Sequence, residues 1–399
     1  MKKKLFGLAT SPAFAFVFAM GIVNLFADMT YEGGASINGP FMGTLGASAA
    51  VISMVAGVGE FLGYGLRFIS GYFSIRTGKH WLITFLGYVI NLLAVPAMAL
   101  AGHWQAAAAF ILLERTGRAI RKPTVEAMLS YTTGELGKGW VYALNTALDE
   151  IGATIGPLVV AGVLFFKGSY HQAYAALSIS AVLALASLSA ARIIFPLPSR
   201  LETQSIRTTK GFTPTYWLYM IAGSFFAAGL MSYELIAFHL AGIQALSKAA
   251  VPVLLAFSTG LGVLASLTLG KWYDKKGNSV VIIAVSLSAL FAPTLFLGGL
   301  PGIIAAMLFW GIGYATQDTL LKALIAGVLP EGKRDFAFGL FYAGYGVGWL
   351  IGSIAMGLLY QHSLIGLVCF SSLAQLASIP FFIMANSNFS RNRLPHSVA

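Results

Sequence analysis

Long apolar runs recur along the whole chain and are separated by short polar segments. A transmembrane helix needs about 20 predominantly apolar residues. The pattern therefore predicts twelve transmembrane helices, over residues 11–40, 46–73, 80–101, 104–131, 138–165, 170–194, 213–241, 247–270, 278–299, 302–328, 335–360 and 363–386. One longer polar connection, PLPSRLETQSIRTTKGFTP (196–214), divides these helices six and six.

One apolar run is interrupted by four cations, Arg115, Arg118, Arg121 and Lys122. The apolar part before them, residues 104–113, would rise only about 15 Å, half of the hydrocarbon thickness. The helix must therefore continue through the basic stretch ERTGRAIRKP (114–123). An intramembrane charge costs about 2.5–3.5 kcal/mol even on a lenient insertion scale. These side chains must accordingly face partners or water.

Composition agrees with an all-α, polytopic membrane protein. Hydrophobic residues make up 57% of the chain and charged residues 10%, which is too little charge to cover a soluble surface. The net charge of +11 does not indicate nucleic-acid binding, because the basic residues are dispersed among short loops. There is no phosphate-binding loop, nucleophile elbow or Cys/His cluster, so neither an enzyme, a cofactor nor a metal is expected.

Lysine and arginine positions predict the topology. With the N-terminus inside, seventeen of the 25 basic residues lie in cytoplasmic segments, and only Lys167 and Lys248 lie outside. Both termini are therefore expected in the cytoplasm, with the chain in the inner membrane as a monomer. The start of the chain resembles a signal peptide but lacks a cleavage site, and we interpret it as an uncleaved first helix.

The two halves of the chain resemble each other. GYFSIRTGKH (71–80) follows the second helix, and GKWYDKKGNS (270–279) follows the eighth, 199 positions later. GATIGP (152–157) similarly corresponds to GWLIGS (348–353). Such repeats are typical of transporters. They predict a six-helix bundle over 1–195, a cytoplasmic linker over 196–212 and a second bundle with a short tail over 213–399.

These motifs resemble those of the major facilitator superfamily, over the whole chain. Its loop after helix two matches the cytoplasmic gate-loop residues Gly71, Arg76, Gly78, Asp274 and Gly277, but Ile75 replaces the acid of the first copy. GATIGP is similar to an incomplete antiporter motif. The resemblance implies two six-helix bundles and alternating access, with helices one, four, seven and ten lining a cavity. It does not fix the substrate.

Helix four carries charges on two faces. Arg115, Arg118, Lys122 and Glu126 share one face, and Arg121 lies on an adjacent one. At offset 196, Lys122 and Glu126 match Asp318 and Lys322, which gives two structural ion pairs of inverted sign. Arg118 and Arg121 match Tyr314 and Gln317. The first half therefore keeps the positive charge, and all four of these positions are candidate cavity residues together with Arg115.

Acidic residues also occur inside predicted helices. Asp28, Tyr31 and Glu32 lie in helix one, Asp149 lies in helix five, and Glu234 lies in helix seven. Apolar surroundings disfavour the charged form of a carboxylate, so Glu32, Glu234 and Asp28 are candidate proton carriers. Tyr31 and Asp149 are candidate cavity residues. The segment DMTYEGG (28–34) could instead form an outer loop.

These features favour a secondary transporter that moves a small molecule by alternating access, coupled to protons. The antiporter-like motif favours export of amphipathic compounds. The alternative is proton-coupled uptake of an anionic metabolite or chelate, which the arginines would attract. A membrane receptor, an integral membrane enzyme or a channel is a further alternative, although no sensor domain or catalytic motif indicates one.

Overall fold

The computed structural model is all-helical over the residues it describes, which are 11–132, 136, 138–198, 211–242, 246–326, 328 and 334–391. The predicted linker 196–212 falls largely outside them, as does the side chain of Asp274. Eleven segments of the described chain are long and apolar enough to cross a membrane. The twelfth, α5 (Trp104–Ser130), has the length to do so but carries the four cations. The predicted polytopic all-α fold is confirmed.

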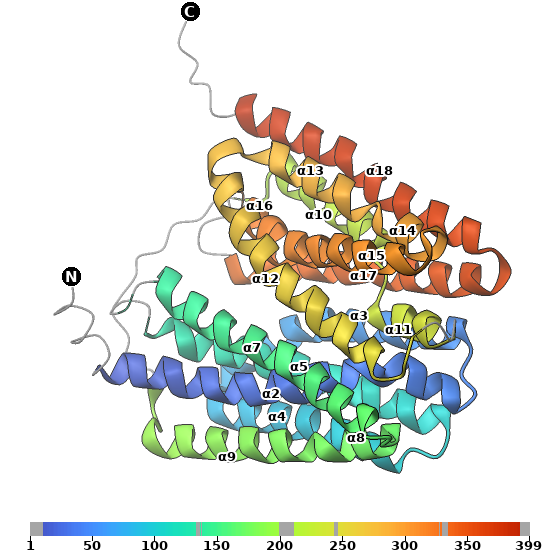
Figure 1. The fold of residues 1–399 in the computed structure, drawn as a ribbon. Coiled ribbons are helices and arrows are strands. Elements are labelled where there is room, and N and C mark those ends of the chain that lie inside the picture. Colours follow the sequence, from blue (N-terminus) through green and yellow to red (C-terminus); the bar gives the residue numbers. More distant parts are fainter. Residues whose placement is uncertain are drawn as a thin grey trace, which may run out of the picture. The chain divides into compact units, whose positions relative to one another are not determined.

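The helices of the first half follow the predicted order closely (Figure 1). Besides α5 they are α2 (Pro12–Thr44), α3 (Ala49–Thr77), α4 (His80–Ala97) with the short η1 (Met98–Leu100), α7 (Lys138–Phe165), α8 (Tyr170–Ala176) and α9 (Ser178–Ile194). Ser11 caps α2 by accepting a hydrogen bond from the Phe14 amide, which fixes its start. Because α2 continues to Thr44, the alternative of an outer loop at 28–34 is wrong.

The helices of the second half are more often interrupted. They are α10 (Pro214–Gly229), α11 (Tyr233–Gly242), α12 (Ala250–Lys276), α13 (Asn278–Ser288), α14 (Phe291–Leu297), α15 (Gly299–Ala315), the π-helical η3 (Thr316–Leu321), α16 (Lys322–Ala326), α17 (Arg334–His362) and α18 (Leu364–Arg391). The predictions of single helices over 213–241, 278–299 and 302–328, and over 170–194 in the first half, are corrected in this respect. No proline marks the break after Gly229, whereas Pro293 lies four residues after Ala289 and cannot donate a main-chain hydrogen bond to the Ala289 carbonyl.

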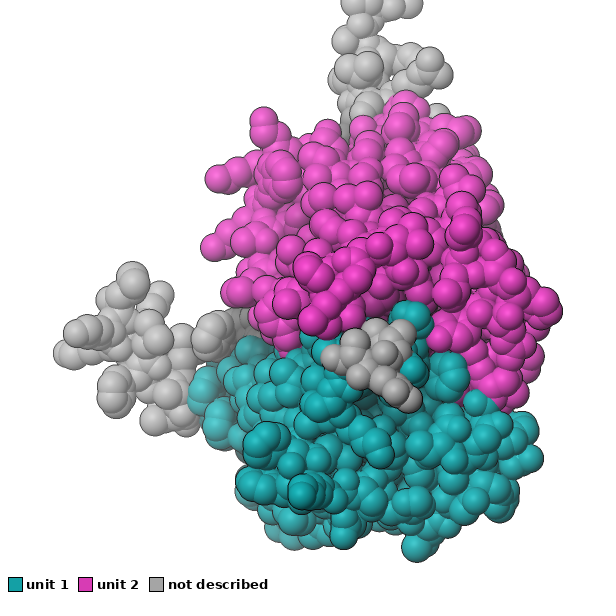
Figure 2. All heavy atoms as spheres, turned by 45° about the vertical axis from the view of Figure 1, so that its right-hand side comes forward, with its two compact units in different colours: residues 1–47, 66–206, 237–256 teal, residues 48–65, 207–236, 257–399 magenta. Residues whose placement is uncertain are grey.

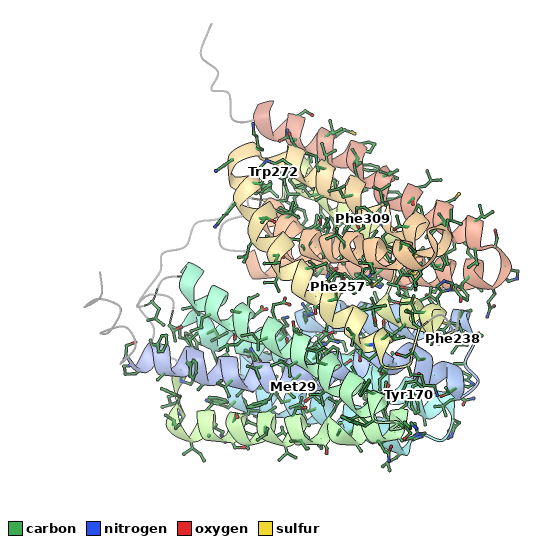
Figure 3. The ribbon with its side chains drawn as sticks, viewed as in Figure 1. Met29, Tyr170, Phe238, Phe257, Trp272 and Phe309 are labelled. Carbon is green, nitrogen blue, oxygen red and sulfur yellow. The ribbon has the colours of Figure 1, made fainter. Side chains whose placement is uncertain are left out.

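Contacts divide the chain into two compact units (Figure 2). Unit 1 comprises residues 1–47, 66–206 and 237–256, and unit 2 comprises residues 48–65, 207–236 and 257–399. The division differs from the predicted halves at 48–65 and 237–256. Within unit 1, for example, the ring of Phe238 (Figure 3) lies close to Gly43 of α2. A Cβ added to Gly43 would lie 2.7 Å from this ring. A long helix can pack on different neighbours along its length.

Glycines bring one pair of helices into close contact in each unit. In unit 1, a Cβ on Gly152 or Gly156 of α7 would collide with the α2 carbonyls of Leu25 and Met29. In unit 2, Gly348 and Gly352 of α17 lie in the same way against the α10 carbonyls of Ser224 and Ala228. Small residues allow such close backbone approach between membrane helices.

The two gate loops also share a backbone conformation. Gly78 ends α3 with φ +64° and Gly277 ends α12 with φ +61°, in the left-handed region that favours glycine. The Gly78 amide donates to the Ser74 carbonyl at 3.0 Å, and the Gly277 amide donates to the Tyr273 carbonyl at 2.7 Å. The repeated glycines of the sequence therefore have the same local role.

Candidate functional site

The basic stretch ERTGRAIRKP lies wholly inside α5, as its length required. Gly117 of α5 packs against the backbone of Asn91 and Gly87 in α4. A Cβ on Gly117 would lie 2.4–2.8 Å from these backbone atoms, and the nearest of them is the Asn91 amide nitrogen. The helix therefore sits directly on α4. Its arginines Arg115 and Arg121 are 8% and 4% exposed, so their charges must be met within unit 1.

Glu114 is the first acceptor of these charges. Its carboxylate lies 3.0 Å from Arg118 Nη2 and 3.3 Å from Arg115 Nε. Asn91 of α4 also donates to it from Nδ2 at 2.9 Å. Sequence reasoning did not select Glu114 as a site residue, although its i,i+4 spacing from Arg118 was a usable signal.

The acids of α2 supply the second set of acceptors. Arg118 Nη1 lies 3.9 Å from Glu32 Oε1, and Arg121 Nη2 lies 3.9 Å from Asp28 Oδ1. Both guanidiniums lie over the ring of Tyr31, at 4.3 Å and 5.6 Å from its centroid. Such cation–π contacts are strengthened by desolvation. The structure thus brings the selected residues of helices one and four together.

A chain of side-chain amides continues the network to α7. Arg121 Nη1 donates to Asn24 Oδ1 at 3.4 Å, and the Tyr88 hydroxyl donates to the same oxygen. Asn24 Nδ2 donates to Asn145 Oδ1 at 2.9 Å, and Asn145 Nδ2 donates to Asp149 Oδ2 at 3.2 Å. Asp149, selected from the sequence, therefore joins the site through two asparagines.

Carboxylates balance the arginines in this network. Arg115, Arg118 and Arg121 are met by Glu114, Glu32 and Asp28, and Asp149 follows beyond Asn24 and Asn145. In a region of low dielectric, such a set is stable only while nearly every charge has a partner. Gain or loss of one proton by an acid therefore changes the balance of the whole set. We call these seven residues the acid–arginine network.

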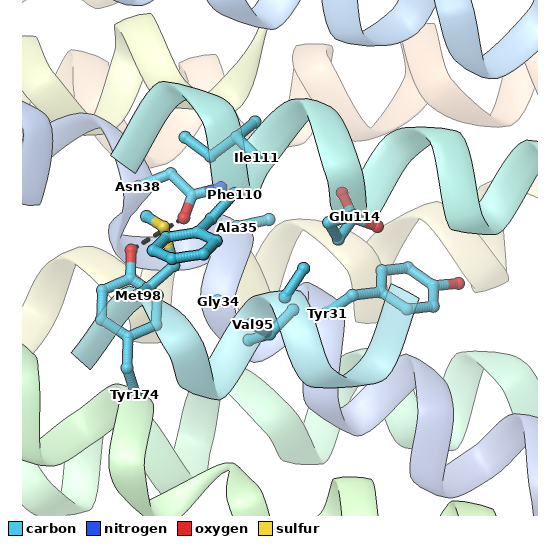
Figure 4. Close-up of a pocket in the computed structure, with 11 residues that line it drawn as sticks. Tyr31, Gly34, Ala35, Asn38, Val95, Met98, Phe110, Ile111, Glu114 and Tyr174 are labelled. Atoms are coloured by element: carbon cyan, nitrogen blue, oxygen red, sulfur yellow. Dashed lines mark hydrogen bonds between the residues drawn. The ribbon is translucent and has the colours of Figure 1, made fainter. Parts of the chain in front are cut away.

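A small cavity adjoins the network on the side of Glu114 (Figure 4). Its volume of about 10 Å³ is near the lower limit for one water molecule. Tyr174 donates from its hydroxyl to Asn38 Oδ1 at 2.7 Å at one end of the lining, and Glu114 and Tyr31 lie towards the other. The cavity is too small for an organic substrate.

The selected residues of unit 2 have different surroundings. Gln317, in the π-helical turn η3, donates from Nε2 to the Tyr64 hydroxyl at 2.7 Å and accepts from the Tyr345 hydroxyl at 2.9 Å. The ring of Tyr314 lies 4.1 Å from that of Trp310. We call this group the amide–aromatic cluster. π-helical turns occur frequently at functional sites.

The remaining charged candidates are Asp318, Lys322, Glu234, Lys122 and Glu126. Lys322 Nζ lies 3.2 Å from Asp318 Oδ1, with both side chains about half exposed. Glu234 is 5% exposed and stands in the first turn of α11, directly after the break in the seventh span. The charged side chain of Lys122 is partly exposed and that of Glu126 is exposed, both on α5.

Comparisons with known proteins agree with this architecture. Residues 13–317 and 221–386 match the Major Facilitator Superfamily. An uncharacterized protein of Mycobacterium tuberculosis is 33% identical over 367 residues, which cover 89% of this chain and 90% of the relative. An uncharacterized transporter of the same type from Methanocaldococcus jannaschii is 25% identical, over 87% of this chain and 89% of the relative.

Solved structures share the fold at low sequence identity. A peptide transporter in complex with alafosfalin superimposes with a TM-score of 0.74 at 14% identity, over 94% of each chain. A nucleoside transporter superimposes with a TM-score of 0.67 at 14% identity, over 94% of this chain and 99% of the other. At this identity the likeness supports the fold and leaves the substrate open.

Proposed function

Because the chain belongs to the major facilitator superfamily and is a secondary transporter of a small molecule, we propose that protons drive its transport through the acid–arginine network. The observation that carries the proposal is that each of two arginines lies between two acceptors. Arg118 is 3.0 Å from Glu114 and 3.9 Å from Glu32. Arg121 is 3.4 Å from Asn24 and 3.9 Å from Asp28.

This arrangement lets an acid of α2 take up a proton at limited cost. When a proton binds Glu32, Arg118 loses its more distant acceptor but keeps Glu114. When a proton binds Asp28, Arg121 keeps Asn24. The arginine then contacts α2 less strongly. The equilibrium between two conformations shifts by the amount that this lost contact costs one conformation more than the other. Release of the proton on the other side of the membrane restores the contact.

Two observations favour export of amphipathic compounds. The arginines are balanced by carboxylates, so little positive charge is left to bind an anionic substrate. The antiporter-like segment GATIGP also packs its glycines on α2 beside Asp28 and Glu32. The alternative, uptake of an anionic metabolite or chelate, rests on Arg118, whose side chain keeps 15% of its exposure. Glu234 of unit 2 is proposed as a further proton carrier.

The proposal includes the topology and organisation expected from the sequence. Both termini would lie in the cytoplasm, with the chain a monomer in the inner membrane. The two bundles would be joined by the linker 196–212. A protease added to the outside of intact cells should leave this linker uncut, whereas inverted vesicles should be cut there. Cutting from outside would refute this orientation.

The deciding experiment is transport in proteoliposomes with an imposed pH gradient, screened with amphipathic and anionic compounds in both orientations. Wild-type protein should accumulate substrate only with the gradient. Glu32→Gln and Glu234→Gln should lose accumulation but retain exchange, because the neutral amide cannot release a proton. Glu126→Gln, at an exposed position of α5, is the matched control and should behave as wild type. Accumulation that ignores the gradient in wild-type protein would refute proton coupling.

A further inference from the structure

Two membrane-spanning segments of unit 2 are interrupted and end beside α18. α10 ends at Gly229 and is followed by the extended residue Leu230 (φ −83°, ψ 115°) before α11 begins. α13 ends at Ser288, and α14 begins three residues later at Phe291. In unit 1 the corresponding first helix, α2, runs without a break from Pro12 to Thr44.

One turn of α18 holds both interrupted ends. Ser371 Oγ donates to the Gly229 carbonyl at 2.7 Å, and Gln375 Nε2 donates to the same oxygen at 3.1 Å. Ser372 Oγ donates to the Ala289 carbonyl at 2.8 Å. The last carbonyls of a helix lack partners within the helix and carry a partial negative charge. Two such ends are therefore brought close to one place inside an apolar bundle.

Three buried oxygen atoms at this place have no hydrogen-bond partner among the described residues. They are Ser232 Oγ in the break of α10 and α11, Ser288 Oγ at the end of α13, and Gln375 Oε1. Their residues are 3%, 0% and 0% exposed. Leaving a buried polar atom of this kind without a hydrogen-bond partner destabilises the folded state. Three in one neighbourhood call for an explanation.

Contacts place Ser288 next to the break in α10. A Cβ on Gly313 of α15 would lie 2.5 Å from Ser288 Oγ and 2.9 Å from Leu230 Cδ1. The indole of Trp310, one turn earlier in α15, donates to the Met231 carbonyl at 2.8 Å. The orphaned Ser288 oxygen thus adjoins a main-chain segment that leaves the helical pattern, and the Gly229 and Met231 carbonyls there accept hydrogen bonds from side chains.

We propose that this neighbourhood binds an alkali cation, with Na⁺ as its ligand. The oxygens concerned are hydroxyl, amide and main-chain carbonyl groups, and such hard donors suit hard cations. They are neutral, which suits a monovalent ion, whereas sites for divalent ions draw on carboxylates. Carbonyls of unwound segments and the C-terminal ends of half-helices coordinate Na⁺ in other transporters. A bound ion would connect α10, α13 and α18 and would satisfy the orphaned oxygens.

The test is equilibrium binding of radioactive Na⁺ to purified full-length protein, with choline replacing Na⁺ at constant ionic strength. Wild-type protein should bind Na⁺ saturably, with Li⁺ and K⁺ as competitors to define selectivity. Ser288→Ala and Ser232→Ala should each weaken binding about 10-fold or more, the order of effect seen when a metal site loses a supporting group. Ser286→Ala is the matched control, because its hydroxyl donates within α13 to the Ile282 carbonyl at 2.8 Å.

Thermal unfolding separates a ligand role from a structural one. The hydroxyls of Ser232 and Ser288 have no described partner, so their removal should not lower the unfolding temperature in choline. The same substitutions should remove the rise in unfolding temperature that Na⁺ produces in the wild type, because a ligand stabilises the folded state that binds it. Absence of saturable Na⁺ binding by the wild type would overturn the proposal and leave a buried water as the occupant. Equal Na⁺ affinities for Ser288→Ala, Ser232→Ala and Ser286→Ala would also overturn it.

Neither readout requires transport or a pH gradient. Failure of the Na⁺ site and failure of proton coupling are therefore distinguishable, because the first is measured by binding and the second by accumulation in proteoliposomes.

Discussion

Arg118 and Arg121 of α5 lie among carboxylates and tyrosine rings in unit 1, whereas their counterparts in unit 2, Tyr314 and Gln317, lie among aromatic side chains. The first group holds its members by charge. The second uses neutral hydrogen bonds between an amide and two tyrosine hydroxyls, at 2.7 Å and 2.9 Å. A proton can change the charge balance of the first group directly, whereas the amide of the second cannot titrate.

One packing contact is shared by the two units, although these side chains differ. Gly152 and Gly156 press α7 on α2, and Gly348 and Gly352 press α17 on α10 at the same spacing. The two units therefore share the close contact of one helix pair, while the side chains at the compared positions of α5 and of the tenth span differ. In the proposal above, the carriers Asp28 and Glu32 belong to unit 1 and the further carrier Glu234 belongs to unit 2.

The largest expected effect is on the packing that the units share. Gly156→Val and Gly352→Val should each abolish a stable bundle or lower its thermal unfolding temperature strongly, because a Cβ at either position collides with a main-chain carbonyl that cannot rotate away. Overpacking typically costs about 1–3 kcal/mol, and occasionally more. Thermal unfolding in detergent measures the effect.

The matched control for this prediction is Gly162→Val in α7, where a Cβ meets open space. It should unfold near the wild-type temperature. If Gly156→Val unfolds like Gly162→Val, the close contact of α7 with α2 is not a requirement of the fold. The packing that the two units share would then not explain their stability.

The next largest effect is expected when the difference in charge between the units is removed. Arg121→Gln installs in α5 the residue found at position 317 and removes the cation beside Asp28. Gradient-driven transport should fall at least about 10-fold, the equivalent of 1.4 kcal/mol, while insertion remains normal. Arg121→Lys should be nearly as impaired, because Lys lacks the planar fork that reaches Asn24 and Asp28 together.

Gln317→Leu in unit 2 provides the comparison for this prediction. It removes two hydrogen bonds and should lower stability more than it changes the pH dependence of transport. A loss of pH dependence in Gln317→Leu, with none in Arg121→Gln, would move the proposed coupling site from unit 1 to unit 2.

The difference in charge between the units could be predicted from the sequence, because the offset of 196 aligns Arg118 with Tyr314 and Arg121 with Gln317. The span of α5 could also be predicted, because ten apolar residues cannot cross a bilayer and a helix that begins at Trp104 must include the cations. Length, in this case, was a stronger signal than hydropathy.

The break between α10 and α11 could not be predicted, whereas Pro293 was a usable signal for the break between α13 and α14. The segment Leu230–Met231–Ser232 contains no proline or glycine, and the break is held by contacts with distant residues, among them Ser371 and Trp310. The link from Asn24 to Asn145 joins residues 121 positions apart and depends on how closely α2 and α7 approach. Such contacts follow from tertiary packing, which periodicity along the chain does not report.

A smaller effect is expected at the duplicated helix ends. Gly78→Ala and Gly277→Ala should each lower stability by about 1–2 kcal/mol, because a non-glycine residue in the left-handed region carries this cost. Gly63→Ala, at a position with open space and ordinary backbone, is the control. Thermal unfolding of the three variants checks whether the two loops respond alike. Clearly unequal losses would show that only one copy still depends on its glycine.

The smallest expected effect concerns the ion pair of unit 2. Lys322 and Asp318 lie 3.2 Å apart but are about half exposed, and exposed i,i+4 pairs contribute only about 0.3–0.5 kcal/mol. Asp318→Asn should therefore hardly change the unfolding temperature. The exchanged variant Asp318→Lys/Lys322→Asp, which gives η3 and α16 the order of charges found at Lys122 and Glu126, should behave in the same way. Glu114→Gln in unit 1 should be far more damaging, because its carboxylate meets two arginines and an asparagine in a buried setting. If Asp318→Asn proved as damaging as Glu114→Gln, the pair in unit 2 would have a role beyond surface pairing, and charge would matter equally in both units.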